Sequence, residues 1–263
     1  MITERDLYAS RIFIRSVLPL IRVIAEERPE IGSKFAGKNG VVQIGALDPD
    51  ADGKTGMHYL IEDGKFTVNL SICENPDIEL LFKDIPSLNG FFSGKSKKLP
   101  KIKGLTRLGL LIPTMKALLF LSSMLSAAQA PREEDKKEFL VKLYFYLLSS
   151  GISQLNKAGH PDVTGWAKRS PDRVYAWRVM DKPELSAYIR VKAGNTKAAR
   201  GQYKRSKPFF TMCFDSVDSA LGTLLQTDDL VDATAAGRLI MEGAPEFGAE
   251  IGDYMMLVGD YAK

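Results

Sequence analysis

Histidine and cysteine are scarce in this chain, which contains two of each among its 263 residues. His58 and His160 lie in different halves of the chain, and no G-x-S-x-G segment occurs near either of them. Two isolated cysteines and two isolated histidines do not have the ligand spacing of a zinc site. No G-x-G-x-x-G segment follows a predicted strand. We therefore expect no bound metal, no cofactor and no catalytic residue.

Acidic residues are absent from one long stretch, between Ile85 and Arg132. The first part of this stretch is rich in basic residues, namely Lys95, Lys97, Lys98, Lys101, Lys103 and Arg107. The net charge of the chain is only +4, which is too small to indicate a nucleic-acid partner. A local basic stretch attracts phospholipid headgroups and acidic ligands, so we expect contact with an anionic membrane or a headgroup. A solvated surface is the alternative.

Signals for secretion or for crossing a membrane are also lacking. The apolar stretch 108–130 is interrupted by Pro113 and Lys116. Its uninterrupted part, 117–128, is shorter than the roughly 20 residues of a membrane span. Glu4 and Asp6 do not fit the basic region of a signal peptide. Since we also expect the two cysteines to be free thiols, we predict a cytoplasmic protein.

Several landmarks recur in the same order in the two halves of the chain. The matched pairs are Pro29 and Pro161, Tyr59 and Tyr188, Gly64 and Gly194, and Cys73 and Cys213. A repeat of this length exceeds the roughly 20–50 residues of solenoid repeats, so it indicates two domains. We place them at residues 1–131 and 132–263. Chance similarity between two α/β segments is the alternative.

Local patterns predict helices and strands in the first half. Thr3 with Asp6 indicates a capped helix that Pro19 kinks or splits. Strands are predicted at 41–47, 57–61 and 66–72, the last of them following the hairpin turn at Asp63-Gly64. We expect Asn75-Pro76 to open the next helix, since Asn is a favoured cap and Pro a favoured first residue. Its apolar stripe would contain Ile78, Leu81, Phe82 and Ile85.

The remaining stretches repeat this alternation. An apolar helix is predicted around 115–128, followed by a linker at 131–137. Further strands are predicted at 173–179, 185–191, 196–203, 209–214 and 238–243. Helices are expected after Asp215 and at 228–236, whereas the last segment, rich in Gly, Met and Tyr, is left without an assigned structure. Helices flanking an antiparallel or mixed sheet, twice over, indicate the α+β class.

An acidic turn at 48–53 matches the first half of a calcium-binding loop, D-x-D-x-D-G. Tyr59 occupies the twelfth position, where such a loop needs a bidentate Glu. A polar turn between two strands is therefore the favoured interpretation.

The segment Asp232-Ala-Thr-Ala-Ala-Gly-Arg-Leu-Ile-Met-Glu-Gly243 resembles the sterol-carrier-protein family, which has a helix followed by G-[K/R]-L-x-apolar-x-G. Tyr59-Leu-Ile-Glu-Asp-Gly64 gives the first half a similar pattern, although Pro100 and extra residues interrupt it later. The resemblance implies two tandem sterol-carrier-like units, each a mostly antiparallel or mixed sheet covered by helices around an apolar cavity. Such domains bind sterols, fatty acids or acyl-CoA esters and usually catalyse nothing.

We expect a hydrophobic small molecule to bind among large apolar side chains. In the first half these are Phe66, Val68, Leu81, Phe82 and Ile85. In the second half they are Tyr188, Phe210, Met212, Leu221, Leu224, Leu225, Met241 and Met256. Large apolar side chains, methionine above all, adapt to varied ligands, although plain core packing explains each residue individually.

Two other functions stay open from the sequence. The first is an enzyme acting on a lipid-like or steroid-like substrate, with Cys213, Asp215, Arg238 or Tyr188 as the polar group in its pocket. The second is a structural module with closed cores that forms a homodimer through the apolar helices at 108–128 and 139–155.

Overall fold

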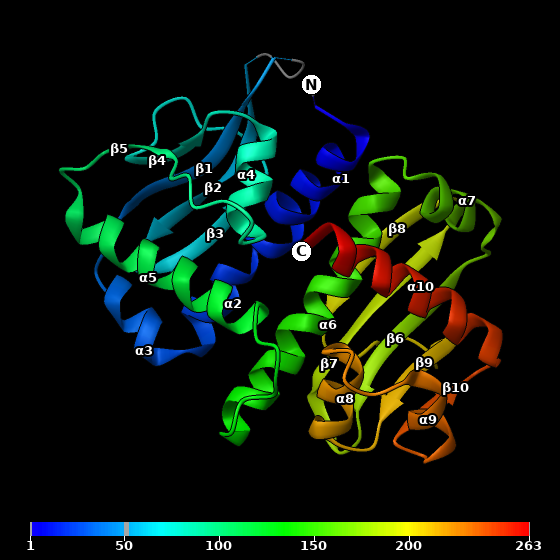
Figure 1. The fold of residues 1–263 in the computed structure, drawn as a ribbon. Coiled ribbons are helices and arrows are strands. Elements are labelled where there is room, and N and C mark those ends of the chain that lie inside the picture. Colours follow the sequence, from blue (N-terminus) through cyan, green and yellow to red (C-terminus); the bar gives the residue numbers. More distant parts are fainter. Residues whose placement is uncertain (1, 50–52, 263) are drawn as a thin grey trace. The chain divides into compact units, whose positions relative to one another are not determined.

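The computed structural model describes residues 2–49 and 53–262, whose fold is shown in Figure 1. Within these residues the strands form two five-stranded sheets, which confirms the predicted α+β class. The chain divides into two compact units between Ser123 and Met124, with the last residues from Tyr261 grouped with the first unit. Each unit contains one of the sheets.

The first unit holds five strands and most of the shorter helices. Its helical segments are α1 (Glu4–Ile12), the π-helix η1 (Phe13–Val17), α2 (Leu20–Glu27), α3 (Pro29–Gly32), the 3-10 helix η2 (Ser33–Phe35), α4 (Ile85–Phe92) and α5 (Leu108–Leu125). Its strands are β1 (Gly40–Asp48), β2 (Gly53–Glu62), β3 (Lys65–Asn69), β4 (Ile78–Phe82) and β5 (Lys101–Lys103). They lie in the order β3-β2-β1-β4-β5.

The second unit has a sheet with the same strand order and, among the described residues, five helices, of which the first is the longest. Its helices are α6 (Glu134–Lys157), α7 (Pro161–Arg169), α8 (Val217–Leu224), α9 (Leu230–Ala235) and α10 (Pro245–Ala262). Its strands are β6 (Arg173–Val179), β7 (Lys182–Lys192), β8 (Asn195–Arg200), β9 (Phe210–Phe214) and β10 (Leu239–Glu242). They lie in the order β8-β7-β6-β9-β10. The predicted boundary at 131–132 falls in the segment between α5 and α6.

The two sheets have the same topology, as the repeated landmarks predict. In each sheet the first and fourth strands pair in parallel, β1 with β4 and β6 with β9. All other neighbouring strands pair antiparallel. A short helix that begins at a proline, α3 or α7, precedes each first strand, and an 18-residue helix, α5 or α10, follows each last strand.

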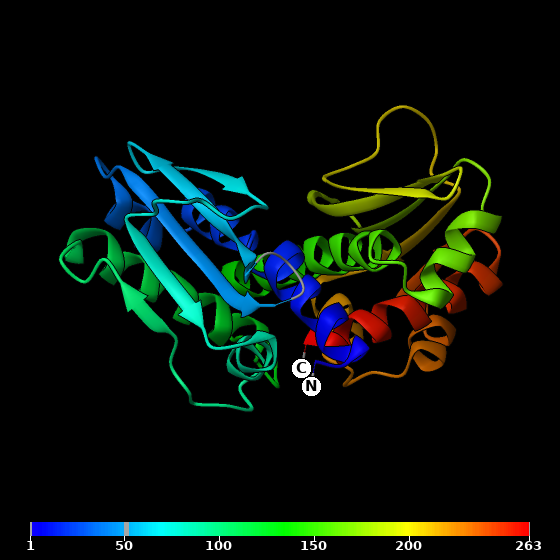
Figure 2. The ribbon, with the colours of Figure 1, turned by 90° about the horizontal axis from the view of Figure 1, so that it is seen from above.

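One face of each sheet is apolar and packs beneath helices. In the first unit Ile44, Tyr59 and Phe82 project to this face and are almost fully buried, and the Tyr59 hydroxyl donates a hydrogen bond to the Leu18 carbonyl. In the second unit Trp177 and Phe214 project to the corresponding face and are almost fully buried. Helix α6 contacts β7 and β8, and Figure 2 shows the helices of this unit on one side of its sheet. The strand period of two places these residues on a single face.

Matching hairpins confirm the Gly64 and Gly194 pair. Asp63 and Gly64 have φ values of 49° and 76°, and Ala193 and Gly194 have 49° and 75°. Two successive positive φ values define the tight turn that suits the twist of a two-stranded hairpin. A Cβ at Gly64 would lie 2.7 Å from the carbonyl oxygen of Phe35. Gly64 therefore meets both a conformational and a packing requirement.

Pro19 splits the first helix, as predicted. The Leu18 amide donates to the Phe13 carbonyl in the wider π pattern, and Pro19 precedes the first residue of α2. Proline lacks the donor that a regular helix would need there. The corresponding position of the second unit, equally far ahead of Pro161, is Gly151, and α6 runs through it unbroken.

The predicted helix from Asn75-Pro76 is wrong. Residues Ile78–Phe82 form strand β4, and α4 begins at Ile85 with Asp84 as its cap. The Asp84 carboxylate accepts a hydrogen bond of 2.8 Å from the Ser87 amide. Strand β4 is paired at both edges, by β1 and β5, and its residues on both faces are buried or half-buried, so both faces accommodate apolar residues. The resulting run of apolar residues resembles a helical stripe in sequence.

Two of the proposed landmark pairs are also wrong. Tyr59 pairs with Val42 on the helix-covered face, whereas Tyr188 pairs with Ala176 on the opposite face, and Ile189 occupies the place that corresponds to Tyr59. A shift of one residue in a strand exchanges its two faces. Cys73 lies in the loop before β4, whereas Cys213 lies inside β9. Both thiols are free.

Gly151 permits close packing of α6 against α10, which leads to a test. A Cβ at this position would lie 2.5 Å from Cγ1 of Val258. We expect Gly151→Ala to lower the free energy of unfolding by about 1–2 kcal/mol, because overpacking outweighs the gain in helix propensity. The measurement is urea denaturation followed by circular dichroism.

The matched control is Gly165→Ala in α7, where the nearest atom to a new Cβ is the flexible end of Arg169 at 3.2 Å. This variant should be neutral or more stable by up to about 1 kcal/mol, as helix propensity alone dictates. Equal stability changes in the two variants would contradict the close packing of α6 and α10.

Candidate functional site

A groove of about 620 Å³ runs along α10 in the second unit. The residues that line it are Asp162, Glu246, Phe247, Glu250, Asp253, Tyr254 and Leu257. Asp162 belongs to α7 and the others to α10. A volume of this size lies within the range of small-molecule sites, which is roughly 300–1,000 Å³.

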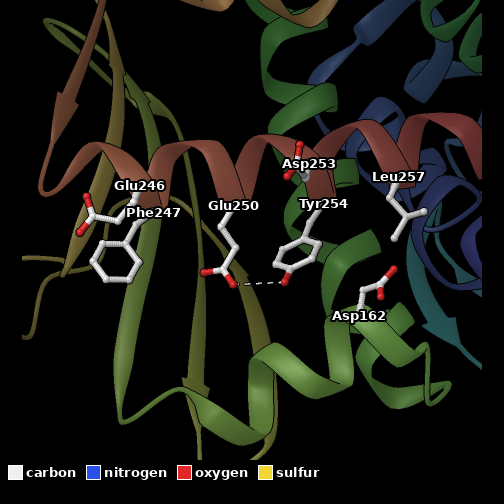
Figure 3. A pocket seen from close by; sticks show the side chains of 7 residues that line it. All are labelled: Asp162, Glu246, Phe247, Glu250, Asp253, Tyr254 and Leu257. Atoms are coloured by element: carbon white, nitrogen blue, oxygen red, sulfur yellow. Dashed lines mark hydrogen bonds between the residues drawn. The ribbon is translucent and has the colours of Figure 1, made fainter.

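Helical periodicity gathers the groove residues on one side of α10. Phe247, Glu250, Tyr254 and Leu257 follow one another at intervals of three or four residues, which places them on one face. In Figure 3 Glu250 and Tyr254 point to the same side of the helix, and Asp162 lies opposite Leu257. The Tyr254 hydroxyl is 3.3 Å from Oε1 of Glu250. The groove is thus lined by two aromatic residues, one leucine and four carboxylates.

A stack of aromatic rings leads from the groove toward the sheet. The Trp166 ring lies 5.3 Å from the ring of Tyr254 and 5.3 Å from that of Tyr175. Trp166 and Tyr175 are 3 % and 1 % exposed. Neither Nε1 of Trp166 nor the Tyr175 hydroxyl has a hydrogen-bond partner within the described residues. A buried donor without a partner lowers the stability of the fold, so Trp166 and Tyr175 each carry such a cost.

Arg173 packs against two aromatic rings, one of which, Phe247, lines the groove. Its guanidinium carbon lies 3.8 Å from the centre of the Phe209 ring and 4.9 Å from that of Phe247. The two phenylalanine rings meet edge to face at 4.8 Å. Cations over aromatic faces are attracted by the ring quadrupole, which holds these three side chains together.

The groove has a strongly negative lining. Four of its seven residues are carboxylates, and none is basic. Burial, together with the adjacent Glu250 carboxylate, raises the pKa of Tyr254, so its phenol stays neutral. Among the described residues no group of three or more His, Cys, Asp or Glu side chains could hold a metal ion. The carboxylates instead set a field that attracts cations and repels anions.

Four of the ligand residues predicted in the first unit lie in strands β3 and β4, and Ile85 begins α4. Phe66, Phe82 and Ile85 are buried, and Val68 and Leu81 are half-buried. The Phe66 ring packs 4.8 Å from that of Phe35, and the Phe82 ring packs 5.2 Å from that of Phe91. Leu81 pairs with Gly45 on the other face of the sheet, so the structure does not bring it together with Phe82.

The ligand residues predicted in the second unit are more dispersed. Those that are fully buried beneath the helices are Phe210, Met212 and Leu221. Those that are half-buried are Tyr188, Leu224, Leu225 and Met241. Tyr188 packs on Tyr203 at 5.0 Å, on the face opposite the helices, and Met256 is 45 % exposed on α10. None of these residues, from either unit, lines the groove.

The predicted headgroup residues lie between α4 and α5. Lys95, Lys97, Lys98, Lys101, Lys103 and Arg107 are all exposed. Two of them form ion pairs within the first unit, Lys103 with Glu79 at 2.9 Å and Arg107 with Asp77 at 2.8 Å. These two residues therefore have a structural role in fastening β5 and the start of α5.

Glu79 is the centre of a buried polar cluster. Its carboxylate accepts hydrogen bonds from Lys54 at 2.6 Å and from Nε2 of Gln43 at 2.8 Å. Oε1 of Gln43 accepts a hydrogen bond of 2.6 Å from the Cys73 amide. Burial acts to raise the pKa of Glu79, but the hydrogen bonds from Lys54, Lys103 and Gln43 lower it below its ordinary value. These partners satisfy the cluster internally, so we assign it to stability.

None of the polar residues considered for catalysis lines the groove, although the Asp215 amide donates a hydrogen bond of 3.0 Å to the Arg238 carbonyl. Cys213 is buried in β9, where burial raises the pKa of its thiol. Asp215 is exposed beside the cap of α8, and Arg238 pairs with Asp228. Part of the acidic turn considered for calcium, residues 50–52, lies outside the described residues.

The groove residues of α10 were missed in the sequence for a physical reason. Gly248, Gly252 and Gly259 lower the helix propensity of the segment and hide its period. Gly248 is required by packing, since a Cβ there would lie 2.6 Å from Sδ of Met241. Apolar or aromatic residues at 247, 251, 254 and 258 carry the helical period that would have revealed α10.

Comparison with known proteins does not assign this chain to a family. No protein-family model matches the chain, and no curated protein matches it. One solved structure that matches is a conserved hypothetical protein from Thermus thermophilus, described as a candidate sterol carrier protein. It is 15 % identical, and the match covers 52 % of this chain and 92 % of that chain with a TM-score of 0.30. A match at this level carries no argument about function.

The Glu79 cluster predicts a pH-dependent stability. We expect Glu79→Gln to lower the free energy of unfolding at pH 7 by about 1–3 kcal/mol, because Lys54 and Lys103 lose their buried partner. The folded-state pKa of Glu79 lies below its ordinary value of 4.5, so its stabilisation is present above pH 4.5. This stabilisation is lost as the pH falls through the folded-state pKa.

The stability difference between wild type and Glu79→Gln should therefore shrink at acidic pH, as measured by urea denaturation at a series of pH values. The control is Glu62→Gln, since Glu62 is exposed at the end of β2. A difference independent of pH would contradict an ionised Glu79.

Proposed function

We propose that this protein binds and carries a hydrophobic small molecule without catalysing a reaction on it, and that the second unit holds the ligand in the groove along α10. The observation that carries the proposal is the groove of about 620 Å³ with Phe247, Tyr254 and Leu257 in its lining. Enclosing a lipid is favourable by roughly 0.8 kcal/mol for each buried methylene. A cytoplasmic carrier of sterol-like molecules is the form of this function that we propose.

The tandem sterol-carrier-like architecture belongs to the same proposal. Its support is local, in the segment that resembles the family. Helix α9 ends before Gly237, which has a φ of 72°, and β10 then runs from Leu239 to Glu242. This is the helix, glycine and strand order of the family pattern. The repeated sheet topology extends the proposal to the first unit.

The charge of the groove restricts the headgroup. A fatty acid or acyl-CoA would bring its anionic group close to Asp162, Glu250 and Asp253, at a Coulombic cost. An uncharged or cationic ligand avoids this cost. We therefore propose a neutral, sterol-like molecule ahead of a fatty acid or its coenzyme A ester.

A pair of arginine substitutions tests the location of the ligand. Leu257→Arg places a long side chain into the groove near Asp162, and we expect at least tenfold weaker binding of a neutral fluorescent sterol analogue, which equals about 1.4 kcal/mol. Met256→Arg is the matched control on the same helix, since Met256 is exposed and does not line the groove. This control should bind the analogue as the wild type does.

Two further results decide the proposal. Native mass spectrometry of protein purified from its own cells should show a bound apolar molecule that the Leu257→Arg variant lacks. A fluorescent fatty-acid analogue should bind at least tenfold more weakly than the sterol analogue. Equal binding of both analogues by wild type and Leu257→Arg would contradict the groove as the site. Turnover of a bound lipid would contradict the absence of catalysis.

A further inference from the structure

Helix α5 of the first unit carries large apolar residues on its buried side and on its exposed side. One side packs into the unit, where Leu110, Ala117 and Leu121 are buried. Leu108, Ile112 and Leu119 are 55 %, 50 % and 66 % exposed. Among the described residues α5 is the one helix long and apolar enough to cross a membrane, and 44 % of it is buried. Large apolar residues on the exposed side of a helix favour a second apolar environment.

The exposed apolar residues of α5 form a stripe on one face of the helix that also contains Lys116. Leu108, Ile112, Lys116 and Leu119 follow at intervals of four, four and three residues, which places them on one helical face. Leu105 and Leu99, which precede the helix, are 60 % and 75 % exposed. Large exposed apolar residues scattered singly are ordinary, but a run of five within one short segment is not.

The charged residues of the segment that contains this stripe are all basic. Lys97, Lys98 and Lys101 precede α5 and are exposed, and Lys116 lies within the stripe. No acidic residue occurs between Ile85 and Arg132. Lys103 and Arg107 face Glu79 and Asp77, so they contribute less to an outward field. Lysines beside exposed leucines are the pattern of a segment that lies in the surface of an anionic bilayer.

The second unit offers an internal comparison. Its α10 has the same length and the same place after the last strand. This helix carries Glu246, Glu250, Asp253 and Asp260 and contains no Lys or Arg. The exposed apolar stripe and the basic residues are therefore absent from this unit's equivalent helix. Because the shared fold tolerates a polar outer face at this position, packing does not require the apolar face of α5.

We propose that the exposed residues Leu108, Ile112, Lys116 and Leu119 of α5 and the exposed segment before it, with Lys97, Lys98, Leu99, Lys101 and Leu105, together form a docking surface for an anionic phospholipid membrane. The lysines approach the negatively charged headgroups, and the leucines enter the boundary between headgroups and acyl chains. The opposite face of α5 stays packed on the first unit, so the helix lies along the membrane and does not cross it. This inference is independent of the ligand groove.

Vesicle flotation with the full chain tests the docking surface. The vesicles are phosphatidylcholine alone, or phosphatidylcholine with about 30 % phosphatidylserine. We expect at least tenfold stronger partitioning to the anionic vesicles, falling as salt shortens the screening length. The triple variant Leu108→Ser, Ile112→Ser, Leu119→Ser should lose at least tenfold of this partitioning. The variant Lys97→Gln, Lys98→Gln, Lys101→Gln should lose both binding and salt dependence.

Matched controls separate docking from folding and from ligand binding. Val231→Ser with Ile240→Ser removes apolar residues of the second unit that are 74 % and 40 % exposed, and it should partition as the wild type does. Leu257→Arg should also keep its vesicle binding, and the triple serine variant should keep its binding of the sterol analogue. Circular dichroism checks that each variant is folded.

Three results would overturn the proposal. The first is equal binding to neutral and anionic vesicles, or binding to neither. The second is unchanged vesicle binding by the triple serine variant. The third is a dimer in sedimentation velocity that the triple variant abolishes, since a second copy of the chain would then cover the stripe.

Discussion

The structure depends on the burial of one apolar face on each five-stranded sheet. Residues such as Ile44, Tyr59 and Trp177 are almost fully buried. Helices must cover this face, because exposing so many apolar side chains to water would be unfavourable. The parallel pairing of the first and fourth strands brings the short helix after the fourth strand onto the same face. The outer residues of the helices before and after each sheet can then differ in charge and polarity between the units, provided that the inner side of each helix remains apolar.

The two units share one sheet topology, but the helices before and after their sheets differ in shape and charge. The helix that precedes the first sheet is broken at Pro19, whereas its counterpart runs through Gly151 and packs against Val258. The helix that follows the last strand is acidic in one repeat and apolar with basic neighbours in the other. A duplicated fold thus provides two surfaces of different chemistry, and our two proposals assign a ligand to the acidic groove and a membrane to the basic, apolar face.

Much of the local structure follows from short-range physics and could be predicted. The capping box at Thr3, the break at Pro19 and the hairpin turn at Asp63-Gly64 depend on neighbouring residues alone. Strand β6 was predicted with its observed bounds, Arg173–Val179. The predictions failed where distant pairing decides the outcome. Strand β4 has an apolar run compatible with a helix, and only its pairing with β1 and β5 makes it a strand. Likewise α10 contains glycines that disfavour a helix in isolation, although one of them, Gly248, fits against Met241 and Phe210.

The sequence by itself indicated two similar units and the α+β class, and it determined the basic stretch without acids and the apolar character of α5. These properties depend on composition, period and order along the chain. Only the tertiary structure decided which apolar residues become core and which stay exposed, because exposure depends on what packs against each face. It placed Phe82 and Met212 in the core and left Ile112 exposed on α5. It also gathered Asp162 and Tyr254 from separate helices into one groove.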